Sequence, residues 1–218
     1  MKEVLDRIEA NLAGLQSWAE TGEPLPFIDE GVDFVVGPPM EEAVLHAIEC
    51  KYELELPPEY RAFLTRFGDT SVGPGHVFRR VNEGLTAQSK NRFPLSKPLL
   101  GTLSPEHLHI PQLQEEEDAV RLFKLWEPIP KESGVLELCD YGCLIYGVLI
   151  LSGPYRDQVW IRTGDSAYYG PFGGFEPLHD ESRLQDWKVS EHPREYSFLE
   201  WYESWLNVRL KMAGLVPW

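Results

Sequence analysis

Residues 56–69 carry the signals for both ends of a short helix, and they constrain the fold more than any other stretch of this chain. Pro57 and Pro58 stand at the start, where the proline ring already holds φ near the helical value and the missing N–H is not needed. Gly68 stands at the end and supplies the left-handed residue that closes many helices. The sequence therefore predicts one helix between these points.

An apolar stripe along this helix predicts that the helix packs against the rest of the protein. Its members follow at i, i+3, i+4 and i+7 and are Tyr60, Phe63, Leu64 and Phe67. Glu59 places a negative charge at the positive end of the helix dipole. None of the stripe residues is a nucleophile, base or metal ligand, so the segment indicates structure and not catalysis.

Three further helices are predicted from periodicity. The first covers about residues 2–20, and Gly22 ends its apolar pattern. The second begins at Pro38 and Pro39, and it should bury Val44, Leu45 and Ile48.

The last helix begins with a capping box, Ser197 to Glu200, flanked by a hydrophobic staple of Tyr196 and Trp201. Gly214 stands where its C-terminal cap is expected. Its aromatic stripe is expected in the core and comprises Phe198, Trp201, Tyr202, Trp205 and Leu206.

The middle of the chain has the patterns of strands. Residues 135–139 and 158–162 alternate, whereas residues 144–151 are apolar on both faces and predict a central strand. Residues 168–171 end the series, residues 32–36 are a further strand candidate, and residues 82–98 are expected to be irregular. We therefore expect one α+β domain over residues 1–218, with N-terminal helices, a mostly antiparallel sheet and a C-terminal amphipathic helix packed on it.

Composition and cysteine usage favour a cytoplasmic protein. The longest apolar run, residues 143–151, is far shorter than the ~20 residues that span a bilayer. No signal-peptide pattern is present at the N-terminus. Cys50, Cys139 and Cys143 lack zinc-site or C-x-x-C spacing, so we expect free thiols in a reducing compartment.

The net charge of −15 disfavours nucleic acid and anionic membranes as partners. Residues 23–59 contain ten acidic residues and one base, while residues 79–97 contain five bases and one acid. Two interpretations remain open. The charges promote solubility and attract one another within the molecule, or they form an acidic surface that steers a basic protein partner.

The side chains with catalytic potential are better explained by structure. His107 and His109 form an i, i+2 pair without a third ligand nearby. Cys139 and Cys143 flank a glycine turn and lack a base partner, and Ser71 lacks the G-x-S-x-G pattern. We expect no catalytic residue, cofactor or metal, and therefore no enzyme.

Binding residues are sought among polar and aromatic side chains on loops, where function is concentrated. Three groups meet this criterion, although each can equally be ordinary surface: the loop after the helix at 56–69, an acidic patch and a tyrosine pair. Their members are Asp69, Thr70 and Ser71; Glu115, Glu116, Glu117 and Asp118; and Tyr168 and Tyr169.

Three segments in the right order resemble the SUKH superfamily, the SMI/KNR-type domain. Residues 39–68 resemble its paired N-terminal helices. Residues 136–160, with Asp-Tyr-Gly-Cys at 140–143 and the Gly153 turn, resemble its central hairpin, and residues 197–206 resemble its closing helix. The resemblance covers residues 38–206, with residues 1–37 as an N-terminal helical extension. It departs from the family at Asp157 and Gln158, where many members carry an Arg-Gly pair, and residues 79–133 have no counterpart.

The resemblance implies an α+β fold and, for bacterial members, an immunity protein. Such proteins bind and neutralise a toxin, often a nuclease, through a stoichiometric complex. The alternative is a regulatory or scaffolding domain like the fungal members, which coordinate cell-wall synthesis through protein contacts. Either function implies a protein partner, which for the toxin would be a basic domain.

Overall fold

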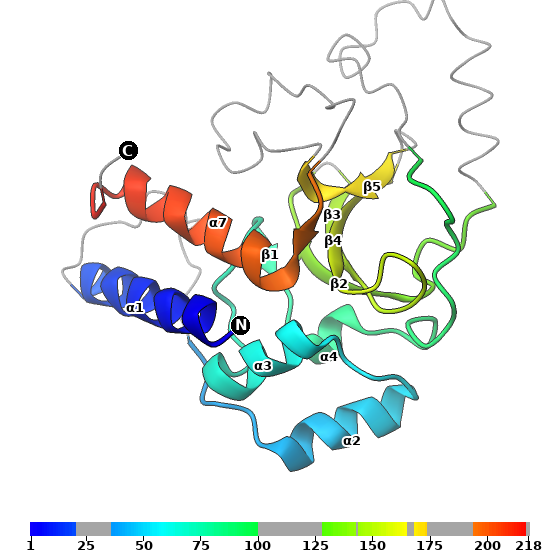
Figure 1. The fold of residues 1–218 in the computed structure, drawn as a ribbon, viewed down its shortest axis with the longest axis horizontal. Coiled ribbons are helices and arrows are strands. Elements are labelled where there is room, and N and C mark those ends of the chain that lie inside the picture. Colours follow the sequence, from blue (N-terminus) through cyan, green and yellow to red (C-terminus); the bar gives the residue numbers. More distant parts are fainter. Residues whose placement is uncertain (21–35, 100–127, 143, 165–167, 174–193, 217–218) are drawn as a thin grey trace, which may run out of the picture.

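The computed structural model describes residues 1–20, 36–99, 128–142, 144–164, 168–173 and 194–216, and these residues form an α+β fold (Figure 1). The helices are α1 (Lys2–Ala19), α2 (Glu42–Tyr52), α3 (Pro58–Phe67), α4 (Val81–Gly84) and α7 (Phe198–Met212). The strands are β1 (Val77–Phe78), β2 (Val135–Asp140), β3 (Ile145–Ile150), β4 (Gln158–Thr163), β5 (Tyr169–Pro171) and β6 (Tyr196–Ser197). The predicted fold class is confirmed. The predicted strand at 32–36 lies outside the described residues except for Val36.

The strands form one antiparallel sheet in the order β1-β2-β3-β4-β5, and β6 also pairs with β4. β3 is buried on both faces, as its apolar run predicted. The strict alternation expected for β2 is wrong, because the register shifts between Glu137 and Cys139 and both Leu138 and Cys139 are buried. In β4, residues Val159 to Thr163 are all buried, since both faces of the sheet are covered.

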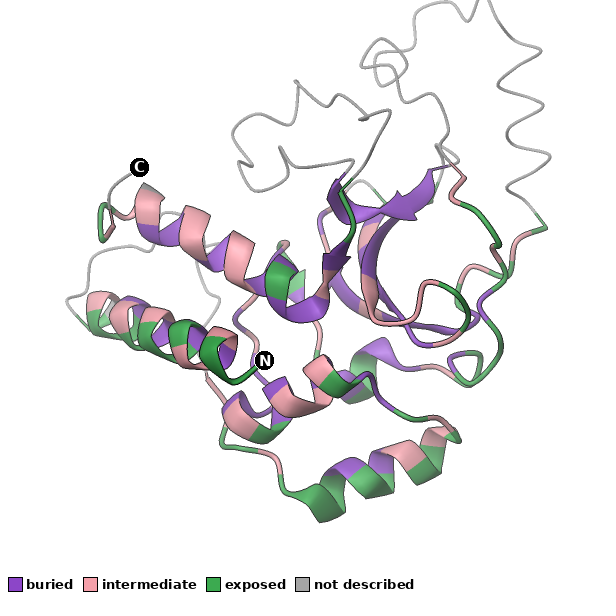
Figure 2. Ribbon diagram, viewed as in Figure 1, coloured by how far each residue is buried: buried purple, intermediate pink, exposed green. Residues whose placement is uncertain are grey.

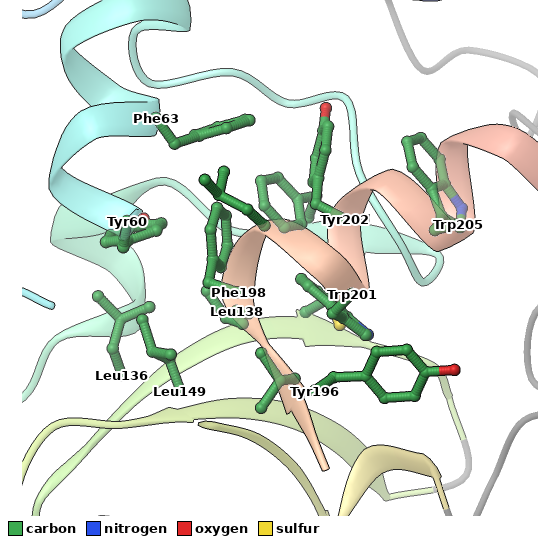
Figure 3. Packing of buried hydrophobic residues seen from close by; sticks show 14 of the residues in the cluster. Tyr60, Phe63, Leu136, Leu138, Leu149, Tyr196, Phe198, Trp201, Tyr202 and Trp205 are labelled. Atoms are coloured by element: carbon green, nitrogen blue, oxygen red, sulfur yellow. The ribbon is translucent and has the colours of Figure 1, made fainter. Parts of the chain in front are cut away.

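One face of the sheet is covered by α7, and α3 packs against the other side of that helix (Figure 3). Phe198 and Trp201 lie over Leu136, Leu138 and Leu149 of the strands. The aromatic stripe of α7 is therefore core, as expected.

The opposite face of the sheet carries a second, smaller core. Phe93, from the chain segment after α4, packs edge-on against Trp160 and Tyr169, with ring centroids 5.3 and 5.4 Å away. Trp160 is fully buried, in agreement with its expected place in the core. The segment at 82–98, which was expected to be irregular, begins inside the short helix α4 and then crosses this face.

The ends of α7 match the sequence signals. The Ser197 hydroxyl accepts a bond from the Glu200 N–H, and the Glu200 carboxylate accepts one from the Ser197 N–H. At the other end Gly214 has φ 70°, its N–H donates to Lys211 O, and the Leu215 N–H donates to Leu210 O. This is the bonding pattern of a Schellman cap.

The staple residues at the start of α7 meet through a third ring. Tyr196 and Trp201 both pack edge-on against Phe172, at centroid distances of 6.0 and 5.9 Å. The segment that follows β5 therefore closes over the entry to the last helix.

α1 lies along α7 and α3 and is held at its surface by charged pairs. The Arg7 guanidinium donates to Glu203 of α7, and Arg66 of α3 bonds Glu9 and lies 2.6 Å from Asp6. Leu5, Ile8, Leu12 and Leu15 are buried beneath these pairs, so the N-terminal helix shares the main core.

α3 begins and ends where its prolines and glycine predict, and its apolar stripe is buried. Gly68 has the expected positive φ of 71°, but its ψ of −164° lies outside the left-handed helical region. This conformation belongs almost exclusively to glycine. It brings the backbone of Gly68 against that of Pro38, where a Cβ would stand 1.9 Å from the carbonyl oxygen.

Replacing Gly68 by alanine should lower the free energy of unfolding by about 3 kcal/mol or more, because backbone strain costs roughly 1–3 kcal/mol and overpacking a similar amount. The matched control is Gly14→Ala within α1, where nothing lies within 4 Å of the added Cβ. The free energy of unfolding of that variant should rise by about 0.5–1 kcal/mol, since glycine is unfavourable inside a helix. Urea unfolding measures both, and equal stabilities would contradict the close approach to Pro38.

Glu59 links α3 to the start of α7, because its carboxylate accepts a bond from the Leu199 N–H at 3.0 Å. Glu59→Ala should lower the free energy of unfolding by about 1–2 kcal/mol, as the loss of a helix-capping acceptor does. Glu59→Gln should cost less, because it keeps an oxygen acceptor. Glu55→Ala is the control, since that side chain is 83% exposed, and it should change stability by less than about 0.5 kcal/mol.

Candidate interaction surface

The loop residues Asp69, Thr70 and Ser71 mainly hold the backbone together. The Asp69 carboxylate accepts a bond from the Val81 N–H at 2.9 Å and so fixes the start of α4. Thr70 is buried, and its hydroxyl accepts a bond from the Val72 N–H. Ser71 is half-buried. The loop therefore offers few free polar groups to a partner.

Tyr168 and Tyr169 are fully buried, so the expectation that they belong to an exposed binding loop is wrong. The Tyr168 hydroxyl donates to Pro171 O at 2.9 Å, and the Tyr169 hydroxyl donates to Lys131 O at 3.2 Å. Burial raises the pKa of both phenols, so they stay neutral. The acidic patch Glu115, Glu116, Glu117 and Asp118 and the pair His107 and His109 lie outside the described residues.

The most exposed face built from described residues belongs to α2. This helix lies at the edge of the molecule, below α3 in Figure 1, and Figure 2 shows that most of it is exposed. Leu45 and Ile48 are buried, but Val44, which was expected to be buried with them, is 47% exposed. One narrow side of α2 is thus enough to attach it.

We define the outer face of α2 as its exposed uncharged residues, Ala43, Val44, His46, Ala47 and Cys50. Their spacing of three and four places them side by side on the helix surface. The exposed charged residues of α2, Glu42 and Lys51, stand near its two ends, so the outer face is uncharged only over the turns between them.

Exposed carboxylates stand near both ends of this face, Glu42 in the first turn of α2 and Glu53 at its C-terminal cap. Between residues 41 and 61 the chain has six glutamates and two bases, Lys51 and Arg61. The carboxylates of Glu42, Glu53 and Glu55 are 67%, 70% and 83% exposed.

Bases from other segments pair with part of this charge. Arg61 binds Glu42 and Glu49, and it holds the pKa of the Glu42 carboxyl below its ordinary value. Lys90 reaches Glu53 at 2.8 Å, which confirms attraction between the basic and acidic segments at this pair. The carboxylates nevertheless stay accessible.

The far face of the sheet holds a polar cluster that the sequence analysis missed. The Glu137 carboxylate accepts bonds from Arg79 Nε at 2.5 Å and from Arg162 Nη2 at 2.7 Å. Arg162 also lies over the Tyr146 ring, 4.8 Å from its centroid. Opposite charges within the apolar strands β2 and β4, which flank β3, were the available signal in the sequence. The mutual pairing of these groups gives them a structural role.

The thiol of Cys139 is unsuited to nucleophilic chemistry, because burial raises its pKa to about 12. Within the ranges that the structure describes, no three His, Cys, Asp or Glu side chains are grouped so that they could hold a metal ion. Cys50 and Cys139 are free thiols, and Cys50 is exposed.

The Asp69 carboxyl gives a prediction for pH dependence. Burial raises its pKa above the ordinary value, against the opposing effects of the Val81 N–H and the Arg80 charge. Because the folded state holds this proton more tightly than the unfolded state, Asp69 costs stability as the pH rises through the raised pKa.

Asp69→Asn keeps the acceptor oxygen and removes this charge. It should therefore be more stable than the unchanged protein near neutral pH, and the difference should shrink at acid pH. Urea unfolding of both proteins from acid to neutral pH measures the difference between their free energies of unfolding. The other carboxyl groups contribute equally to both proteins, so their effects cancel in this difference. A difference in the free energy of unfolding that does not change with pH would contradict a raised pKa for Asp69.

None of the helices in the described ranges combines the length and hydropathy that a membrane span requires. Comparisons of the chain with protein-family models, curated proteins and solved structures find no match in any of the three.

Proposed function

We propose that this chain is an immunity protein that binds and neutralises a basic toxin, and that the outer face of α2 is the surface that the toxin contacts. The observation that carries the proposal is the combination on one peripheral helix of an uncharged centre, which includes Val44, and a border of exposed carboxylates. The toxin as partner rests on the resemblance of three sequence segments to the SUKH superfamily.

The two parts of this surface have different physical roles. The carboxylates act at long range, because an acidic field speeds the encounter with a basic domain. The uncharged centre acts at short range, because it can be covered without the cost of burying unpaired charge. Together they suit a protein partner whose active site is basic, such as a nuclease.

The ion pairs at the border do not oppose docking. The pair between Glu53 and Lys90 joins two exposed side chains, and such pairs contribute about 0–1 kcal/mol. A basic partner can therefore replace the intramolecular cation at little cost.

The proposal predicts that Ala47→Arg weakens the complex with the cognate toxin by about tenfold or more, equivalent to roughly 1.4 kcal/mol. The added side chain would obstruct the centre of the outer face. Ala13→Arg is the matched control, because Ala13 is also exposed on a helix, α1, and the charge change is the same. Titration calorimetry on the purified proteins measures both affinities.

Association should also slow as salt is added, because the acidic field is screened. If both arginine variants weaken the affinity for the toxin equally, the outer face of α2 is not the surface that the toxin contacts. Absence of both complex formation and protection from the toxin would overturn the immunity function. Specific capture of a housekeeping protein in its place would support the regulatory or scaffolding alternative.

A further inference from the structure

His46 and Cys50 form an unassigned pair of potential metal ligands on the outer face of α2. They are four positions apart in the sequence, so their side chains lie one helical turn apart on the same side. Both are exposed, and Cys50 carries a free thiol. Imidazole and thiolate are the two ligand types most used by Zn²⁺ in proteins.

The distance between the two ligand atoms fits one shared ion. Cys50 Sγ lies 3.5 Å from His46 Nε2. Zinc bonds of about 2.3 Å to sulfur and about 2.0 Å to nitrogen, set at a tetrahedral angle, separate the two atoms by roughly 3.5 Å. The spacing of the two ligand atoms therefore suits one shared ion with no change of helix geometry.

The surroundings favour a cation at this point. Glu42 stands one turn before His46, and Glu53 lies three residues after Cys50. These carboxylates are paired with Arg61 and Lys90, but they remain 67% and 70% exposed. The nearest base, Lys51, is directed to the Tyr52 ring, with Nζ 4.5 Å from the centroid and 3.1 Å from the hydroxyl. The pair thus has carboxylates on both sides, and the adjacent ammonium is engaged elsewhere.

We propose that His46 and Cys50 bind Zn²⁺ as a two-ligand surface site, with water in the two remaining coordination positions. Binding displaces the proton of the thiol, which passes to solvent, and the thiolate and the neutral imidazole bind the ion. Two protein ligands hold zinc less tightly than the three or four of catalytic and structural centres. The ion therefore exchanges with solvent.

His46 and Cys50 belong to the face proposed to contact the toxin, but the test of the zinc site needs no partner protein and so can fail or succeed separately from the toxin experiment. Neither cysteine pairing nor zinc-finger spacing in the sequence points to this pair. The informative signal was a histidine and a cysteine at i, i+4 within one predicted helix, the spacing that also places two histidines on zinc in H-E-x-x-H helices.

The test is the rate at which iodoacetamide alkylates Cys50 in the full chain, followed by peptide mass spectrometry with and without Zn²⁺. The expected result is protection of Cys50 by saturating Zn²⁺, reversed by a chelator. His46→Ala should weaken zinc binding by roughly tenfold or more, because even groups outside the ligand set change metal affinity by about 10–100-fold. Because the method reports on one cysteine, Cys139 and Cys143 do not contribute to the signal.

A variant that combines Ala47→Cys with Cys50→Ala is the matched control. It keeps the composition but places the thiol next to His46, and adjacent helix residues do not face each other. The relocated thiol should therefore gain no protection from Zn²⁺. Alkylation of Cys50 that is unaffected by Zn²⁺, or protection that persists in folded His46→Ala protein, would overturn the site. Circular dichroism establishes that each variant is folded.

Discussion

The contact between α3 and α7 is the interaction on which the rest of the structure depends. The ring of Phe63 lies 5.1 Å from that of Phe198 and 4.7 Å from that of Tyr202, and Tyr60 lies 4.8 Å from Phe198. Such aromatic pairs contribute about 0.5–1.5 kcal/mol each beyond their buried area. Because α7 also covers the sheet and supports α1, this one contact fixes the places of both the sheet and α1 relative to α3. It joins residues about 140 positions apart, so it depends on long-range closure of the chain.

Features determined by neighbouring residues could be predicted from the sequence. The capping box at Ser197, the Schellman cap at Gly214 and the proline start of α3 each depend on groups within a few residues, and each was found where expected. The apolar run of β3 was also informative, because a strand buried on both faces needs no polar side. Val44 shows where periodicity fails as a guide to burial. The helical spacing of Val44 suggested burial, but the side by which α2 contacts the protein is narrower than the apolar stripe of α2, so Val44 is exposed.

The candidate surface was harder to predict than the fold, because exposure depends on what the rest of the chain covers. Tyr168 and Tyr169 stand beside a glycine and a proline and so resembled loop residues. Pairing of β5 with β4, and a bridge from Leu99 to Tyr169, place both inside the protein. The acidic character of residues 41–61 was visible in the sequence, whereas the uncharged centre between those acids became visible only once α2 was known to attach by one side.

Long-range attraction and short-range contact are separable in this molecule. The field comes from the whole chain of net charge −15, so changing any single carboxylate alters it little. The proposed contact surface comes from a few side chains on one helix, where a single bulky residue can remove it. The ion pair of Arg61 and Glu42 contributes to both effects. It joins α3 to α2, and its Glu42 carboxylate is 67% exposed beside the outer face of α2. The burial of Leu45 and Ile48 sets the position of α2, and thus the accessibility of Ala47 and Cys50, whereas the exposed ion pair adds little to that position and mainly tempers the local field.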